Sequence, residues 1–323
     1  MKKDNCQIGM DEKAIHYTRI GGQAVIEGVM MKGPTKIATA VRKSNGEIVV
    51  DKKDLNPATS KNKFLKLPIL RGVIAFISSM VTGIKCLMYS ADQVDFDDDE
   101  GYEESKFEKW LDDKFGDKIS DIVIYFSVFV SLIFSIGLFM ILPNLIAGIF
   151  KIIISNRIIL NLIEGVIRIG IFLLYIVLVS QMKDIRRVFE YHGAEHKTIA
   201  TYESGEELTV ENARKFSRLH PRCGTSFLLI VMVISIIFFS VLSWESVWQR
   251  LLYRLLLLPV VAGLSYEVIT FTGKSKNKCV KWLTKPGLWL QKLTTREPDD
   301  EQIEVAIEAI KNVLTGNKED DKW

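Results

Sequence analysis

Residues 157–181 read RIILNLIEGVIRIGIFLLYIVLVSQ and form one of four long apolar runs in the chain. The other three cover residues 121–142, 226–243 and 252–271, and Pro143-Asn144 is expected to end the first of them. Each run is close to the ~20 apolar residues that an α-helix needs to cross a bilayer core. The runs therefore predict a mainly α-helical, polytopic membrane protein with four transmembrane helices.

The charged residues indicate how these helices are oriented. Apolar residues make up an ordinary 48% of the sequence, but the 25% that are charged lie mostly between the runs. The loop at 182–225 and the tail after 272 are rich in lysine and arginine, whereas the opposite connections carry only Lys151 and Arg250. The positive-inside rule then predicts a multi-pass plasma membrane protein with both termini and the 182–225 loop in the cytoplasm. Its predicted partner is the lipid bilayer; a net charge of +3 gives no indication of nucleic acid binding.

The segments outside the membrane domain at 121–272 have distinct patterns. Residues 1–63 predict a small cytoplasmic α+β unit, since Asn45-Gly46 between two β-prone runs is a hairpin signal. Residues 64–90 favour an interfacial or re-entrant helix, because their apolar core is only 13 residues long. A transmembrane helix at 68–90 is the alternative. An acidic linker and an amphipathic helix are expected at 91–120. The cytoplasmic tail at 273–323 predicts an interfacial helix and a second amphipathic helix opened by Pro298.

Three of the four histidines lie in the 182–225 loop, and two of them belong to the pattern His192-x-x-Glu195-His196. On a helix, residues four apart share a face, so both imidazoles can reach one metal ion, with zinc as the first choice. A glutamate between them can act as general base, as in the inverted zinc-peptidase motif. Such sites need a third ligand, and Glu267, 71 residues after His196, is predicted at the same membrane face. This reading predicts a hydrolytic centre.

Other residues leave alternatives open. His220 and Cys223 could complete a closed, four-ligand structural zinc site, or Cys223 could be a nucleophile beside His220. Glu27 lies in a glycine-rich stretch, where it is either a ligand or acid or simply solvated. Lys197 and Arg222 could hold an anionic substrate or a lipid headgroup, but cytoplasmic basic residues already have a topological explanation.

Three stretches carry a resemblance to a known family: GGQAVIEGVMM at 21–31, YHGAEHK at 191–197 and HPRCGTS at 220–226. They resemble a bacterial family of polytopic membrane proteins of unknown function that are labelled predicted metal-dependent enzymes. The similarity continues through Ser265-Tyr266-Glu267 to TTREPDD at 294–300. The resemblance implies metal dependence but no substrate, reaction or ligand set.

Together these patterns predict a metal-dependent integral membrane enzyme, a hydrolase, with its site at the cytoplasmic membrane face. The alternative is a non-catalytic membrane scaffold or transporter, with a structural His/Cys zinc site or no metal.

Overall fold

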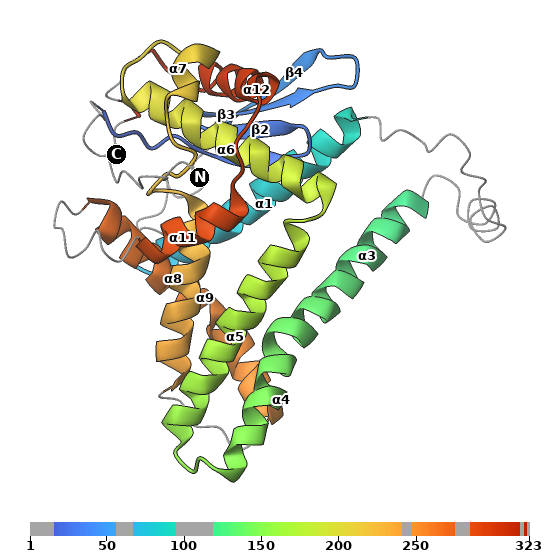
Figure 1. The fold of residues 1–323 in the computed structure, drawn as a ribbon, viewed down its shortest axis with the longest axis vertical. Coiled ribbons are helices and arrows are strands. Elements are labelled where there is room, and N and C mark those ends of the chain that lie inside the picture. Colours follow the sequence, from blue (N-terminus) through green and yellow to red (C-terminus); the bar gives the residue numbers. More distant parts are fainter. Residues whose placement is uncertain are drawn as a thin grey trace, which may run out of the picture. The chain divides into compact units, whose positions relative to one another are not determined.

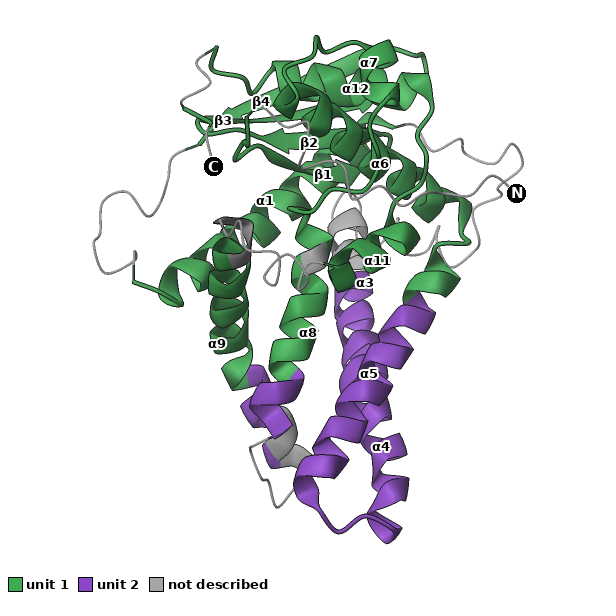
Figure 2. Ribbon diagram, turned by 60° about the vertical axis from the view of Figure 1, so that its left-hand side comes forward, with its two compact units in different colours: residues 1–94, 176–235, 256–323 green, residues 95–175, 236–255 purple. Residues whose placement is uncertain are grey.

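The computed structural model describes residues 16–55, 67–94, 119–240, 247–274, 285–316 and 320–321. The protein is mainly helical and has a small antiparallel sheet near its N-terminus (Figure 1). Two compact units divide the chain: residues 1–94, 176–235 and 256–323 form the first, and residues 95–175 and 236–255 the second (Figure 2). Most of the acidic linker and amphipathic helix expected at 91–120 lies outside the described residues.

The sheet consists of β1 (Gly21–Val25), β2 (Gly28–Lys32), β3 (Lys36–Arg42) and β4 (Ile48–Asp54), paired in sequence order. Gly46 in the β3–β4 turn has a φ of 87°, a conformation that favours glycine, so the predicted hairpin is confirmed. Because successive side chains of a strand point to opposite faces, the sheet has two packing surfaces.

Helices cover both surfaces of the sheet. Val29 and Met31 pack in one core with α6 (Lys183–Glu203) and α12 (Asp300–Lys311). Val25 and Met30 pack on the opposite face with Cys86 of α1 (Leu70–Gln93). The helices α1, α6 and α12, which are distant from one another in sequence, thus pack around the sheet at residues 21–54.

The two tail helices are α11 (Lys285–Thr294) and α12. Asp299 caps α12, since its side chain accepts from the Gln302 N–H and the Gln302 side chain accepts from the Asp299 N–H. Pro298 therefore precedes this capping box. Its missing N–H had suggested that it would be the first helical residue, and that prediction was wrong. The predicted apolar face of α12 is confirmed, because Ile303 and Ile310 are fully buried.

The first apolar run is longer than expected. It comprises α3 (Ile119–Ile136), a π-helical segment η3 (Gly137–Ile141), α4 (Leu142–Ile149) and a 3₁₀ turn η4 (Phe150–Ile152). The prediction that Pro143 ends the helix was wrong. The Leu142 N–H bonds to the carbonyl of Gly137, five residues back, so the hydrogen-bond ladder shifts at the proline and the helix continues.

The other apolar helices are α5 (Arg157–Val179), α8 (Gly224–Ser240) and α9 (Val247–Lys274). Among the described residues, four segments are long and apolar enough to cross a membrane: Leu70–Gln93, Phe126–Ile152, Arg157–Val179 and Leu252–Phe271. The third predicted run is a shorter apolar helix, Phe227–Ser240. The segment predicted at 64–90 is one helix of 24 residues, since Lys85 lies exposed on its surface and does not interrupt it.

Candidate metal centre

Helix α6 presents the residues of the H-x-x-E-H pattern from one region of its surface. It is held by Tyr191, Ala194 and Ile199, which are buried against the sheet and α12. The centroids of the His192 and His196 rings are 4.4 Å apart, as expected for residues one turn apart on a helix. Packing of α6 thus fixes where both imidazoles lie.

A third ligand-type side chain comes from the end of the same loop. Cys223 lies directly before α8, and its Sγ is 3.2 Å from His192 Nε2. One ligand atom each from His192, His196 and Cys223 lies within 4.8 Å of the other two. The backbone N–H of Thr225, in the first turn of α8, donates to the same sulfur over 3.4 Å. These contacts assemble a two-nitrogen, one-sulfur cluster.

Backbone carbonyls set the tautomer of both histidines. His192 Nδ1 is 2.9 Å from the carbonyl oxygen of Thr294, and His196 Nδ1 is 2.6 Å from that of Arg218. A carbonyl only accepts hydrogen bonds, so each Nδ1 carries a proton and each Nε2 of a neutral ring presents a lone pair. His196 Nε2 is buried and has no hydrogen-bond partner among the described residues. This is the arrangement found around metal-binding histidines.

The charges of the cluster are strongly coupled. Burial opposes an imidazolium at His192, but the Cys223 thiolate and Glu195 outweigh burial and raise the pKa of His192 to about 9. Burial likewise opposes a thiolate, yet the two neighbouring imidazoles hold the pKa of Cys223 well below its ordinary value. The neighbouring imidazoles therefore favour the thiolate form of the sulfur.

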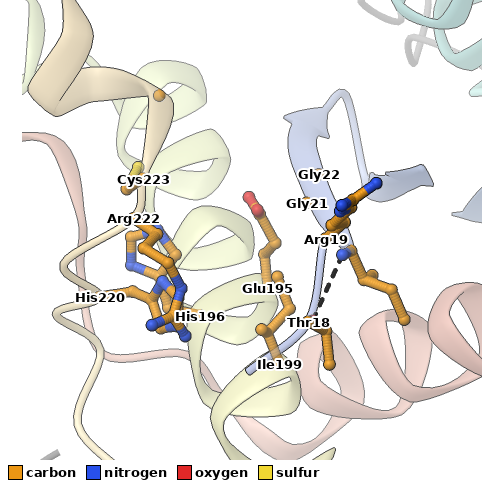
Figure 3. Close-up of a pocket in the computed structure, with 12 residues that line it drawn as sticks. Thr18, Arg19, Gly21, Gly22, Glu195, His196, Ile199, His220, Arg222 and Cys223 are labelled. Carbon is orange, nitrogen blue, oxygen red and sulfur yellow. Dashed lines mark hydrogen bonds between the residues drawn. The ribbon is translucent and has the colours of Figure 1, made fainter. Parts of the chain in front are cut away.

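A small cavity of about 110 Å³ adjoins the cluster and is lined by Glu195, His196 and Cys223 on one side and by Gly21 and Gly22 on the other. Figure 3 shows the Glu195 side chain projecting from α6 between the cysteine and strand β1. Burial raises the pKa of this carboxyl, while the two histidines and the Gly22 N–H partly offset burial. A side chain at Gly22 would lie 3.0 Å from the Glu195 carboxyl carbon, so glycine leaves the space that Glu195 occupies.

The structure does not bring the expected third ligand, Glu267, to this cluster. Its carboxylate binds the guanidinium of Arg71 at the start of α1, with the Arg71 Nε at 2.7 Å. An arginine offers a planar pair of donors that matches both carboxylate oxygens, so Glu267 is paired away from the histidines. His220 is also outside the cluster, because its Nε2 lies 3.5 Å from a carboxylate oxygen of Glu203. The closed four-ligand alternative is therefore not assembled.

The remaining candidate residues have partners within the fold. Glu27 lies in the β1–β2 turn, and its carboxylate accepts hydrogen bonds from two nitrogen atoms of the Arg187 guanidinium. Lys197 is buried and donates to the backbone carbonyls at positions 214 and 216. Arg222 binds the buried carboxylate of Glu203. These contacts account for the three residues by packing and charge pairing.

Several residues that organise the cluster carry no catalytic pattern of their own. Thr294 and Arg218 contribute only carbonyl oxygens, which any residue type has. The Gln291 side chain binds both the N–H and the carbonyl of His220, at 2.8 and 2.7 Å. Gly193, between the motif residues, is the sequence feature that could have indicated this packing. A Cβ there would overlap the Arg296 carbonyl and force apart α6 and the 294–298 segment.

A family model described as "Protein of unknown function (DUF1385)" matches residues 67–316. "Uncharacterized protein YqhQ" of Bacillus subtilis (strain 168) is 38% identical over 299 residues, which cover 91% of this chain and 92% of that protein. No solved structure matches. Neither description names a metal or a reaction, so the metal dependence implied by the resemblance gains no support from them. The chain belongs to the DUF1385 family.

Proposed function

We propose that this protein is a multi-pass membrane protein that binds a divalent metal ion, zinc, through His192, His196 and Cys223, and that the centre is hydrolytic. One observation carries the proposal: two imidazoles whose Nδ1 atoms are tied to carbonyls bring their Nε2 atoms close to one cysteine sulfur. A buried thiolate needs positive charge beside it, and a metal ion would supply that charge in place of the proton on His192.

The donor set favours zinc. Imidazole nitrogen and thiolate sulfur are the ligands that Zn²⁺ prefers, whereas Mg²⁺ and Ca²⁺ prefer oxygen. Three protein ligands with an open fourth position are typical of catalytic zinc sites, and four ligands are typical of structural ones. The cavity beside Cys223 and His196 provides room for the open position.

Glu195 would be the general base of such a centre. A bound zinc ion supplies a Lewis acid that lowers the pKa of water and polarises a carbonyl or phosphoryl oxygen. Glu195 lines the same cavity, and burial raises the pKa of its carboxyl, which makes the carboxylate a stronger base. The Gly22 N–H holds the carboxylate in place while it accepts a proton.

The membrane location rests on the four long apolar helices and on the exposed apolar side chains along them, such as Phe129, Ile133 and Leu174. Monomeric proteins in water rarely expose so many contiguous apolar side chains, whereas the surface of a membrane-spanning helix in lipid is apolar. By the positive-inside rule, the basic 182–225 loop supports a position of the metal centre on the cytoplasmic face of the plasma membrane.

The test is the metal content of the purified full-length protein, measured for the wild type and four variants. We expect one zinc per chain in the wild type, Glu195→Gln and Glu267→Gln, and loss of zinc in His196→Ala and Cys223→Ser. Glu267→Gln is the matched control, since it removes the carboxylate paired with Arg71. Metal-free wild type after growth and purification with added zinc would refute the site.

Cobalt substitution separates an open site from a closed one. A sulfur-to-cobalt charge-transfer band should be present in the wild type and absent in Cys223→Ser. Added azide should change the cobalt ligand-field spectrum if a coordination position is open. A spectrum that does not respond to azide would favour a structural site.

A second candidate is a cysteine nucleophile, which the 3.2 Å contact between Cys223 and His192 favours. It predicts rapid alkylation of Cys223 by iodoacetamide at neutral pH whether or not zinc is present. The metal hypothesis predicts that zinc protects the thiol. The metal hypothesis also explains why His196 Nε2 is buried without a hydrogen-bond partner among the described residues.

A further inference from the structure

We propose that α1 does not cross the membrane but docks into the cytoplasmic leaflet, with its exposed apolar stripe against lipid. The stripe consists of Ile77, Met80, Val81, Ile84, Leu87 and Met88, each at least 40% exposed. The proposal rests on the membrane location given under the proposed function and is independent of the metal.

The path of the chain supports this through a parity argument. The sheet at 21–54 packs against α6 and α12, so all three lie on one side of the membrane. An even number of crossings must therefore separate the sheet from α6, and also α6 from α12. Three candidate crossings precede α6: α1, the α3–α4 run and α5. The connecting segments 56–66 and 95–118 carry no apolar run of the required length. At least one of the three candidates must therefore stay on the cytoplasmic side.

The contacts of α1 identify it as that helix. Cys86 and Ser90, in its C-terminal half, are buried against the sheet, where the Ser90 hydroxyl accepts from the Ile26 N–H over 3.2 Å. Gly83 is pressed against the Gln23 side chain. A strand with polar neighbours cannot follow a helix into hydrocarbon. The C-terminal half of α1 therefore stays at the level of the sheet.

The N-terminal half of α1 packs against two apolar helices, α9 near its middle and α8 near its start. Gly72 lies against Gly263 and Tyr266 of α9, and the Phe76 ring is 6.0 Å from that of Phe227, in the first turns of α8. The sheet, α8 and α9 therefore cover a face of α1 that is distinct from the stripe. Both figures show α1 running obliquely beneath the sheet toward α8 and α9 (Figures 1 and 2).

Lipid is the occupant that these surroundings favour. At 24 residues α1 is about 36 Å long, and its stripe follows the 3–4 residue spacing of one helix face. Through Gly72, α1 packs against α9, itself a candidate for crossing the bilayer. On α11, Trp289 is 66% exposed while its neighbour Leu290 is buried, which suits a second interfacial helix that also contributes the Thr294 carbonyl to His192. The two helices would hold the metal centre at the membrane surface.

The experiment introduces single cysteines into the full-length protein. The parent carries Cys6→Ser and Cys279→Ser, and the labelling of its two remaining cysteines is subtracted. A membrane-impermeant maleimide is applied to inverted vesicles and to intact spheroplasts. Leu67→Cys and Asp92→Cys mark the two ends of α1, and Asn45→Cys in the β3–β4 turn is the control. We expect all three to label in inverted vesicles only. Opposite sidedness of the two α1 ends would overturn the inference.

Spin labels then identify what covers the stripe. Labels at Ile77 and Ile84 should collide with oxygen several-fold more than with a water-soluble nickel complex, at depths of about 5–10 Å. A label at Asn45 should show the reverse preference. Low collision with both reagents at the stripe would indicate a protein partner and overturn the lipid assignment. If the whole chain is extracted from membranes by alkaline carbonate, the membrane location in the proposed function fails as well.

Discussion

Replacing Gly193 by alanine tests whether the close approach of the 294–298 segment to α6 builds the proposed metal centre. The alanine Cβ would lie 3.2 Å from Pro298 Cδ and 3.3 Å from the Arg296 carbonyl carbon, and it would overlap the carbonyl oxygen. Backbone atoms must therefore move. The same segment supplies the Thr294 carbonyl that holds His192, so the shift reaches the ligand.

Two opposing effects set the expected magnitude. Alanine is favoured over glycine in a helix interior by about 1 kcal/mol. Overpacking at a rigid contact costs about 1–3 kcal/mol. The net expectation is a loss of stability of up to about 2 kcal/mol. Loss of a hydrogen bond that orients a metal-binding histidine lowers metal affinity by roughly 10–100-fold, so affinity should change more clearly than stability.

The assay is zinc affinity by competition with a chromophoric chelator, together with thermal unfolding of the protein in detergent. Gly170→Ala in α5 is the matched control, because nothing in the described structure lies within 4 Å of the position its Cβ would take. Its zinc affinity should equal that of the wild type. Wild-type zinc affinity in Gly193→Ala would refute the role of this contact.

Glu203 should contribute to stability in a pH-dependent way. Burial alone would raise its pKa, but His220 and Arg222 outweigh burial and lower it, so the contribution is present above about pH 4.3 and is lost as the pH falls through the lower folded-state pKa. Glu203→Gln should therefore cost about 1–3 kcal/mol in denaturant unfolding at pH 7 and reduce the loss of stability on acidification. Asp299→Ala should remove the cap of α12 and cost about 1 kcal/mol; an unchanged unfolding midpoint would contradict this. Removing zinc with a chelator should lower stability by about 4 kcal/mol relative to protein held at a thousandfold excess over Kd, and re-addition should restore it.

Local patterns determined much of the fold. The apolar runs, the Asn45-Gly46 turn and the apolar face of α12 were all readable, because each depends on residues within a few positions of one another. Where the prediction was wrong, at Pro143 and Pro298, a neighbouring hydrogen bond changed the local geometry: the π-type bond from Leu142 to Gly137 and the Asp299 cap. Those bonds depend on details that composition does not specify.

The sequence by itself determined that His192 and His196 share a helix face, since a spacing of four residues suffices for that. Only the tertiary structure decided their companion. Cys223, 31 residues after His192, reaches the imidazoles because the packing of α6, α8 and α11 brings the ends of the loop together. Glu267 has the chemistry of a ligand but faces Arg71, 196 residues away in sequence. Ligand type is a property of a residue, whereas convergence is a property of the packed chain, and no spacing rule connects the two.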